Sequence, residues 1–330
     1  MSLEEYKTMK KPQVSVVMSV YNAEKYLSQS IDSILNQTFE DFEFIIIEDC
    51  STDNSLTILE DYSMQDSRVK IIRKQENKGM KGFIENLNIG LHRAQGEYIA
   101  RMDADDISHP TRFEKQVAFL RDNPDVFMVG SSINLIDEEN NFIKRLEALE
   151  RDSLIKRVMP KQISMYHPVI MFRNDSEVRY RENIYYCEDY DLYLRLMYNG
   201  SKFYNFAEPL LDYRILNSSI SRKDGKFYRT LFLEKMKSFY KERMLEGKDS
   251  YEHFNPEYFL NILNEEKKSL KEDLEFGLKV ATKFGYNKEF SILKKKYQLD
   301  NGFNFNVAIY SLLNSLPWSF TKLYFKLFID

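Results

Sequence analysis

The amino-acid sequence predicts an α/β protein with a mostly parallel sheet flanked by helices and a helical extension at its C-terminal end. Three observations lead to this prediction. Short apolar, β-branched runs alternate with segments of helical periodicity over about the first hundred residues. Polar and acidic residues directly follow several of those runs. Beyond residue 222 the strand signals become scarce and long helical periodicities take over. Alternation of strand and helix implies right-handed crossovers and therefore a parallel sheet.

The first four predicted strands are short and almost wholly apolar, as expected of strands covered on both faces. They comprise residues 14–20, 42–47, 69–72 and 96–102. Helical patterns separate them: one through Tyr26 to Leu35 with Asn22 as its N-cap, one through Leu56 to Leu59 capped by Asp53, and one from Phe83 to Ala94. Ligands of such sheets bind at the carboxyl ends of the strands.

The later part of the chain is predicted more coarsely. A helix over 113–120 precedes a strand over 126–129, and short strands and loops follow from about residue 135. Further helices are expected at 188–198, 232–244, 258–284 and 307–328. Turn-forming residues at 217–219 and 223–225 predict a boundary near 218–226. We therefore expect an α/β domain that carries the ligand site over 1–222 and a helical region over 223–330.

Composition excludes several classes of protein. A net charge of -4 over 330 residues argues against a nucleic-acid binder, which would need a basic face. The two cysteines, Cys50 and Cys187, cannot form a disulfide framework and fit a reducing compartment. The charged N-terminus does not resemble a signal peptide, and no apolar run has the length of a transmembrane helix. We expect a cytoplasmic protein that is soluble or peripheral at the inner face of the cell membrane.

An acidic turn follows the fourth predicted strand. Asp103, Asp105 and Asp106 lie within four residues of one another where a buried strand should end. Crowded carboxylates raise one another's pKa unless a cation shares them. Hard oxygen ligands suit Mg²⁺ or Mn²⁺, which usually complete their coordination with substrate phosphates. The alternative is a solvated acidic turn before Pro110.

The first two strand-to-helix turns carry candidate nucleotide contacts. Tyr21 can lie against a base, and the amides near Asn22 can face a phosphate. The alternative is that Tyr21 packs in the core and Asn22 only caps a helix. In the second turn, Asp49 can accept the N3–H of a uracil, because an ionised carboxylate only accepts hydrogen bonds. Helix capping explains Ser51 and Asp53 in this turn but not Asp49.

In these motifs the chain resembles the family 2 glycosyltransferases, which have the GT-A fold. The resemblance covers roughly residues 12–222 and rests on several ordered motifs, at residues 14–27, 33–39, 44–53, 96–106, 167–173 and 188–192. It implies an inverting hexosyl- or N-acetylhexosaminyl-transferase that uses a nucleotide-diphospho sugar, usually a UDP-sugar. The Gln-x-x-Arg-Trp motif of processive polymerases is absent near residues 213–216, which favours one sugar per encounter.

The resemblance also assigns roles to residues. The donor would be bound by Val20, Tyr21, Asn22, Glu24, Asp49 and Asp103. A divalent cation, Mn²⁺ or Mg²⁺, would be bound by Asp105 with Asp103. Inversion needs a base on the face of the sugar opposite the leaving diphosphate, and the candidate is Asp189, with Glu188 as the alternative. A position at the start of a helix keeps a carboxylate ionised, although both acids would also simply favour that helix end.

Two further features have both functional and structural interpretations. His167 could line the acceptor or phosphate side, or be structural. Residues 303–328 are unusually apolar, with Pro317 breaking any helix there, and only Lys322 and Lys326 are charged. This stretch is predicted either to contact a membrane interface, which would suit a lipid-linked acceptor, or to pack within the protein or in a homo-oligomer.

The sequence therefore predicts transfer of a sugar to a glycan or lipid-linked acceptor of a cell-surface polysaccharide or glycolipid. One alternative is a sugar nucleotidyltransferase, which would normally have a Gly-rich, basic loop after the first strand, where this chain has Tyr21 to Glu24. The other is a catalytically degenerate binding or scaffold subunit, against which the carboxylates at 49, 103, 105 and 189 argue.

Overall fold

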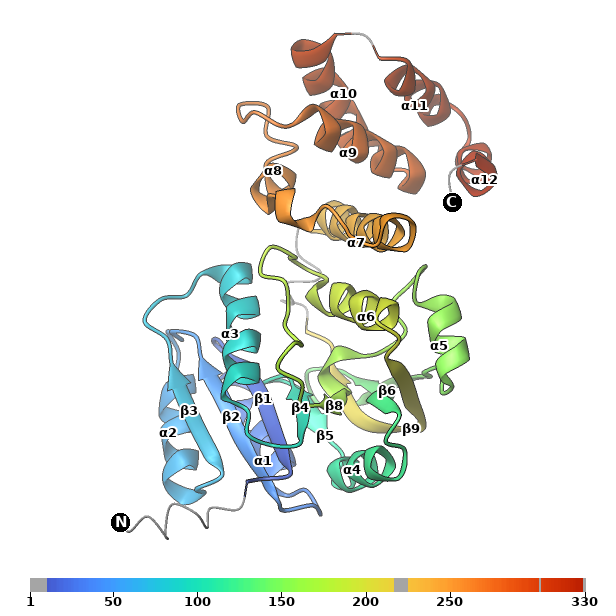
Figure 1. Ribbon diagram of the computed structural model, residues 1–330. Helices are drawn as coiled ribbons and strands as arrows, with labels where there is room; N and C mark the ends of the chain where they lie inside the picture. The colour runs from blue at the N-terminus through green and yellow to red at the C-terminus, as the bar shows by residue number, and fades with distance from the viewer. Residues whose placement is uncertain (1–10, 217–224, 303, 329–330) are drawn as a thin grey trace. The chain divides into compact units, whose positions relative to one another are not determined.

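A computed structural model describes residues 11–216, 225–302 and 304–328 (Figure 1). The described chain divides into two compact units. The first contains the residues up to Glu182 and resumes at Glu188, and the second contains Asn183–Cys187 and the residues beyond 224. Each unit has its own core and is considered separately. The roles expected for residues 1–222 and 223–330 stay a prediction.

The first unit is built on a nine-stranded sheet whose first four strands confirm the sequence prediction. Strands β1 (Val14–Val20), β2 (Phe42–Glu48), β3 (Val69–Arg73) and β4 (Tyr98–Met102) are parallel and lie in the order β3-β2-β1-β4. Every residue of β2 and β4 is buried, as their mostly apolar character predicts, including the charged Glu43, Glu48 and Arg101. The carboxyl ends of β2 and β4 therefore flank that of β1 at one edge of the sheet.

Helices connect these strands. They are α1 (Leu27–Leu35), α2 (Ser55–Gln65) and α3 (Gly79–Arg93). Helix α3 packs so closely on the sheet that a Cβ at Gly90 would lie 2.2 Å from Val17 Cγ1, which only glycine permits. The predicted N-cap of α1 is wrong: the cap is Tyr26, and Asn22 has a φ of 49° in the preceding loop. Asp53 does accept a hydrogen bond from the Ser55 N–H at the start of α2, although Asn54 is the N-cap.

The remaining strands make the sheet mixed. They are β5 (Ile107–Ser108), β6 (Val126–Ile136), β7 (Phe142–Leu146), β8 (Met171–Arg173) and β9 (Lys202–Arg214). β8 pairs antiparallel with both β4 and β6, and β9 pairs parallel with β6. The helices of this part are α4 (Arg112–Asp122), α5 (Asp152–Val158), the short 3₁₀ helix η2 (His167–Val169) and α6 (Glu188–Tyr198). The sequence predicted α6 with the observed bounds but missed α5 and the length of β6 and β9.

The second unit is helical, as predicted. Its elements are α7 (Lys226–Glu246), η3 (Tyr251–His253), α8 (Pro256–Leu260), α9 (Lys271–Phe284), α10 (Asn287–Asn301), α11 (Phe305–Ser315) and α12 (Trp318–Phe328). Its core is aromatic: Phe232 contacts Phe254 and Phe259 edge to face, and Tyr185 packs on Phe232. None of its described helices, nor any other described helix, combines the length and apolar character needed to cross a bilayer.

One prediction for this unit is corrected and another is confirmed. The helix expected over 258–284 is two helices, α8 and α9, separated by the segment 261–270. The break arises because the buried ammonium of Lys296 binds the carbonyl oxygens of Asn264 and Ile262, which a continuous helix would use internally. As predicted, the apolar stretch breaks at Pro317, between α11 and α12. Of that stretch, Phe303 and the side chains of Trp318 and Phe328 lie outside the described residues.

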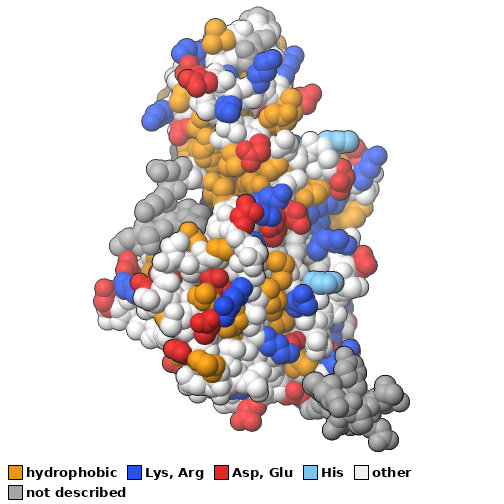
Figure 2. Space-filling view, turned by 90° about the vertical axis from the view of Figure 1, so that its left-hand side faces the viewer, with side chains coloured by type: hydrophobic (Ala, Val, Ile, Leu, Met, Phe, Trp, Pro, Cys, Tyr) orange, Lys and Arg blue, Asp and Glu red, His pale blue; other side chains and the backbone are white. Residues whose placement is uncertain are grey.

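Charged side chains are mixed over the surface. On the face drawn in Figure 2, the described Lys and Arg side chains lie among Asp and Glu side chains and form no continuous basic stripe. This distribution agrees with the small net charge of -4.

Candidate active site

The loops after β1 and β2 are tied together at the carboxyl edge of the sheet. Asn22 Oδ1 accepts a hydrogen bond of 2.7 Å from the Thr52 N–H, and the Asn22 N–H donates to Ser51 Oγ at 3.1 Å. The Asn22 side chain therefore holds the loop after β1 against the loop after β2. The neighbouring Tyr21 is 50% exposed, so its ring is available to a ligand.

Glu24 extends the same cross-link. Its Oε2 accepts hydrogen bonds from the backbone N–H and the side-chain amide of Asn54, at 2.9 and 2.8 Å. In return, the Glu24 N–H donates to Asp53 Oδ2 at 3.1 Å. The first two strand-to-helix turns are therefore cross-linked into one surface, called here the ledge (residues 21–24 and 49–54). The carbonyl of Val20 accepts a hydrogen bond of 2.9 Å from the Asp49 N–H and joins the ledge to the sheet.

Asp49 lies buried in that ledge, at the end of β2. Its Oδ1 is 3.0 Å from Lys74 Nζ, and its Oδ2 accepts a hydrogen bond of 3.2 Å from Asn77 Nδ2. A Cβ at Gly82 would lie 3.5 Å from Oδ2, so a small residue on α3 leaves this carboxylate room. Lys74 and Asn77 fix the direction of the Asp49 carboxylate, and the sequence analysis did not assign either of them a role.

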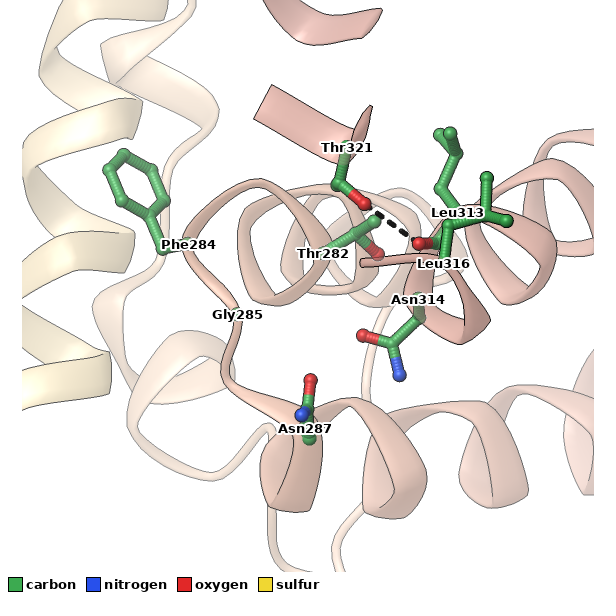
Figure 3. Close-up of a pocket in the computed structure, with 8 residues that line it drawn as sticks. All are labelled: Thr282, Phe284, Gly285, Asn287, Leu313, Asn314, Leu316 and Thr321. Carbon is green, nitrogen blue, oxygen red and sulfur yellow. Dashed lines mark hydrogen bonds between the residues drawn. The ribbon is translucent and has the colours of Figure 1, made fainter. Parts of the chain in front are cut away.

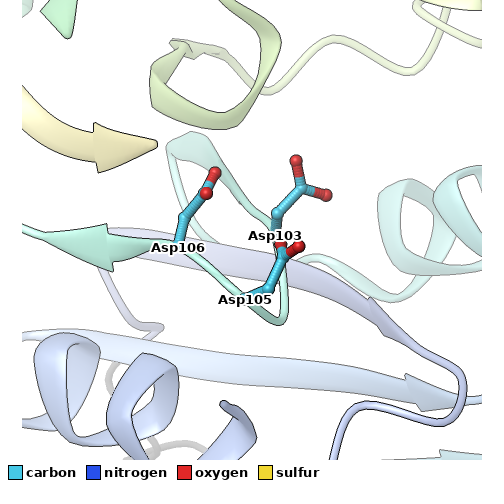
Figure 4. A group of neighbouring side chains, drawn as sticks. All are labelled: Asp103, Asp105 and Asp106. Atoms are coloured by element: carbon cyan, nitrogen blue, oxygen red, sulfur yellow. The ribbon is translucent and has the colours of Figure 1, made fainter. Parts of the chain in front are cut away.

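The acidic turn after β4 gathers three carboxylates. Oxygen atoms of Asp103, Asp105 and Asp106 all lie within 4.8 Å of one another. Figure 4 shows the three side chains on a single turn, with those of Asp103 and Asp106 pointing the same way. The turn is held from below, because Ser30 Oγ donates to the Asp103 carbonyl at 2.8 Å.

The carboxylates of this turn are electrostatically strained. Burial, and then the charge of Asp103, raises the pKa of Asp105 to about 7. Burial raises the pKa of Asp106 well above its usual range, and the charges of Asp105 and Asp103 add to this effect. The buried guanidinium of Arg101 forms an ion pair with Asp103 but leaves the other two acids without a direct cationic partner among the described ion pairs.

The first turn of α6 adds two acids. Asp189 and Glu188 are partly exposed there, and Asp189 Oδ1 accepts a hydrogen bond of 2.7 Å from the Tyr190 N–H. Burial, followed by the charge of Asp189, raises the pKa of Glu188 to about 8. The charge of Asp103 contributes to the same shift, so the α6 terminus and the acidic turn act on each other.

Comparison with known proteins shows the family of this chain. Residues 15–180 match the family described as Glycosyl transferase family 2. The O-antigen biosynthesis glycosyltransferase WbnJ of Escherichia coli is 38% identical over 242 residues, which cover 70% of this chain and 91% of WbnJ. The putative glycosyltransferase EpsE of Bacillus subtilis is 36% identical over 64% of this chain and 76% of its own length.

The chain belongs to glycosyltransferase family 2.

The fold agrees with this assignment. TarS of S. aureus, in its complex with UDP-GlcNAc, aligns with a TM-score of 0.59 at 16% identity, covering 95% of this chain and 91% of that one. Both the α/β architecture and the expectation of a GT-A fold with a helical C-terminal region are therefore confirmed. The protein is a glycosyltransferase enzyme, as the sequence motifs predicted.

The acidic turn of this glycosyltransferase fits a divalent cation. Three hard oxygen ligands converge, and their raised pKa values show that negative charge there is not balanced. Asp106 Oδ2 is buried and, among the described residues, has no hydrogen-bond partner. Asp106 is therefore a third candidate ligand beside Asp103 and Asp105, although the resemblance assigned the cation only to those two.

His167 lies in η2 and is buried. Its Nε2 is 2.7 Å from the hydroxyl of Tyr180, and burial, assisted by the charge of Arg101, lowers the pKa of His167 well below its usual range. The imidazole is therefore neutral at physiological pH. In this arrangement His167 is suited to positioning Tyr180 and not to neutralising a phosphate.

From sequence, Arg214 could be grouped only with several other cations able to contact phosphate, and its actual partners could not be identified. It is buried at the end of β9, and its Nε donates to the Asp105 carbonyl while its backbone N–H donates to Asp106 Oδ1, both at 2.8 Å. An arginine directly after an apolar strand was the only available signal. Its partners are more than a hundred residues away in sequence, so no local pattern identifies them.

Proposed function

We propose that this glycosyltransferase is inverting and transfers one sugar from a UDP-sugar to a hydroxyl of a surface-polysaccharide or glycolipid acceptor. The observation that carries the proposal is the placement of Asp49 and of the acidic turn at the ends of β2 and β4, on either side of β1. Ligands of parallel sheets bind at that edge. Two relatives support it: WbnJ is named for O-antigen biosynthesis, and TarS was solved with UDP-GlcNAc.

The nucleotide would lie on the ledge between the first two turns. The exposed ring of Tyr21 offers a face to the uracil, and Asp49 offers a carboxylate oxygen to its N3–H. Lys74 and Asn77 hold that carboxylate in place, and Lys74 Nζ itself lies beside Gly82, 3.3 Å from where a Cβ there would be. Discrimination between bases would come from this hydrogen bond.

The diphosphate would lie by the acidic turn. Asp105 and Asp103, with Asp106 beside them, would hold Mn²⁺ or Mg²⁺, which when bound neutralises the charge that develops on the UDP leaving group. Arg101 orients Asp103 through their ion pair. Asp189 would accept the proton of the acceptor hydroxyl. At the same time the hydroxyl oxygen bonds to the anomeric carbon, and the bond from that carbon to the diphosphate breaks.

The neighbouring acids support Asp189 rather than Glu188 as the base. With a pKa raised to about 8, Glu188 is largely protonated at neutral pH and cannot accept a proton there. The negative charge that favours this protonation comes partly from Asp189 itself. The helix start of α6 stabilises the remaining carboxylate.

Two measurements test the proposal. A thermal-shift panel of UDP-, GDP- and dTDP-sugars, each with and without Mn²⁺, should show the largest stabilisation with a UDP-sugar and metal. Asp189→Asn should keep that stabilisation but lower both transfer and slow donor hydrolysis at least about 100-fold. The control is Glu182→Gln, which alters an exposed carboxylate of the same unit. Unchanged transfer by Asp189→Asn would remove Asp189 as the base, and a preference for GDP or dTDP donors would contradict the role of Asp49.

A further inference from the structure

The two C-terminal helices expose an apolar stripe that the fold does not use. On α11, the exposed Phe305 and Leu312 and the half-buried Ile309 fall within about 60° of arc, and the exposed Leu316 follows as the C-cap in extended backbone. On α12, Phe320, Leu323 and Leu327 form a similar stripe at positions i, i+3 and i+7. Each of the six exposed side chains is between 41% and 72% accessible.

Other side chains of these two helices are already buried within the helical unit. Val307 and Leu313 of α11 and Phe325 of α12 are buried, and the rings of Tyr310 and Phe325 stack with centroids 6.4 Å apart. Figure 3 shows Thr321 of α12 bonded to the Leu313 carbonyl, with a distance of 2.8 Å, beside a hollow of about 250 Å³. The exposed stripe is therefore a second apolar face on a pair of helices whose inner face is fixed.

The charges of this segment are all of one sign. No Asp or Glu occurs between Asn301 and Phe328, and the exposed Lys322 and Lys326 are its only charged residues. On α12 they lie beside the stripe, not within it, offset by about 60° to 100° from its edge. Lysines placed there can rest their methylene stems on an apolar layer and reach outward with their ammonium groups.

Helix α10 adds further positive charge next to α11. A hollow of about 340 Å³ between these helices is lined by Lys294 and Lys295, by serine, asparagine and glutamine side chains, and by Phe290. The ammonium of Lys295 already pairs with Glu265 at 2.7 Å. The α11 residues that line the hollow include Ser311 and Ser315, which adjoin the exposed stripe on the helix surface. An anionic group held in this hollow would therefore meet the ammonium of Lys294 on α10.

We propose that α11 and α12 bind the surface of an anionic lipid bilayer, with the stripes in the acyl boundary and the lysines at the lipid phosphates. Interfacial helices are recognised by such a combination of an apolar face and flanking cations. A second copy of the chain fits less well, because a two-fold interface brings the same patch against itself. The lysines would then approach one another, and the segment supplies no carboxylate to pair with them. The inference goes beyond the proposed function, since it concerns where the enzyme works and not its reaction.

Vesicle flotation of the full chain tests the proposal. We expect the protein to float with phosphatidylcholine vesicles that contain an equal part of phosphatidylglycerol, and much less with phosphatidylcholine alone. The triple variant Leu312→Glu, Leu323→Glu and Leu327→Glu should lower the floated fraction at least tenfold. Because these three side chains are exposed, the variant should keep the thermal melting temperature and the donor hydrolysis of the original chain. The control is Met64→Glu on α2, where the methionine is 78% exposed, and it should float normally.

Two further measurements separate the outcomes. Lys322→Ser with Lys326→Ser should reduce binding to anionic vesicles to the level seen with phosphatidylcholine alone. Trp318 is the only tryptophan of the chain, so its emission should shift to shorter wavelength when anionic vesicles are added. Absence of flotation by the original chain, or equal flotation of the triple variant, would overturn the proposal. A dimer in sedimentation that the triple variant dissociates, without flotation, would overturn it in favour of self-association. Donor binding enters none of these readouts, so failure here leaves the proposed function intact.

Discussion

Arg214 Nε donates a 2.8 Å hydrogen bond to the backbone carbonyl of Asp105, across 109 residues of sequence. The same guanidinium reaches Asn140 Oδ1 at 2.6 Å and Gln29 Oε1 at 2.7 Å, and it lies over the ring of Tyr26. Arg214 thus connects the acidic turn to α1 and to the turn between β6 and β7. The guanidinium therefore binds the backbone carbonyl of Asp105 and not its carboxylate, which suits it to holding the acidic turn in position.

We predict that Arg214→Met lowers transfer by about 100-fold, since a displacement of the order of 1 Å in a site costs about this much. Arg214→Lys should recover little of the lost activity. The planar guanidinium binds Asp105, Asn140 and Gln29 at once, and an ammonium group cannot. The concentration of Mn²⁺ needed for half-maximal activity should rise in both variants, which a general loss of stability would not produce. Steady-state kinetics with a metal titration measures this effect.

The control for that experiment is Arg121→Met, which alters an arginine whose side chain is 65% exposed on α4. It should leave both the rate and the metal requirement unchanged. Equal rates for Arg214→Met and Arg121→Met would show that the acidic turn holds its geometry without Arg214.

The sequence was sufficient for the parts of the site that depend on local patterns. A buried parallel strand must end where its apolar run ends, so the acidic turn after β4 and Asp49 after β2 could be placed at one edge of the sheet. The partners of these acids could not be found in this way. Lys74 and Arg214 are brought to the site by other strands, and only the sheet order makes them neighbours of Asp49 and Asp105.

The same limit applies to the C-terminal unit. Periodicity located α7 and the break at Pro317, because both depend on adjacent residues. It joined α8 to α9 and missed α10. The intervening segment 261–270 departs from helix because of Lys296, which lies 32 residues after Asn264 and binds its carbonyl. Long-range hydrogen bonds of this kind leave no periodic signal.

A second prediction concerns Asp49. Asp49→Asn should weaken binding of UDP by about tenfold or more, because the amide can present its N–H₂ group to the uracil N3–H and because Lys74 loses the nearer of its two ionic partners, Asp49 and Glu85. Isothermal titration with UDP measures the affinity. Lys74→Met is the matched comparison, since it breaks the same ion pair but keeps the carboxylate. It should lower the melting temperature and affect UDP affinity less. An unchanged affinity in Asp49→Asn would exclude Asp49 from base recognition.

A third prediction follows from the raised pKa of Glu188. The groups whose charges act on Glu188 are Asp189 and Asp103, which raise its pKa, and Arg101, which lowers it, with burial the largest cause. A carboxyl whose pKa is about 8 in the folded protein binds its proton more tightly than in the unfolded chain. The stabilisation from this protonation is therefore lost as pH rises through about 8.

Glu188→Gln mimics the protonated acid and should remove that loss. We expect the two melting temperatures to match near pH 4, and that of Glu188→Gln to exceed that of the original chain by an amount that grows between the ordinary pKa of 4.5 and about pH 8. Transfer should persist in Glu188→Gln and decline less at alkaline pH, since no second charge then develops beside Asp189. Melting curves and pH-rate profiles of the two proteins provide the comparison. If Glu188→Gln abolished transfer while Asp189→Asn did not, the assignment of the base would move to Glu188.

The last prediction concerns the stability of the helical unit. Lys296 of α10 is 3% exposed, and its ammonium binds the carbonyl of Asn264 and the hydroxyl of Ser269, both at 2.7 Å. Lys296→Met keeps the length of the side chain but leaves buried acceptors of segment 261–270 without this donor. We expect a loss of about 2 kcal/mol in the free energy of unfolding of this unit.

The adjacent Lys295 supplies the matched control. Its side chain is 63% exposed and forms an ion pair of 2.7 Å with Glu265, an arrangement that contributes little in water. Lys295→Met should therefore melt like the original chain, whereas Lys296→Met should melt earlier and be cleaved faster by proteases within 261–270. Because the chain has two units, the melting of each must be followed separately, and only the transition of the helical unit should move. Equal melting of the two variants would mean that the segment between α8 and α9 is held by its own turns and not by the buried ammonium.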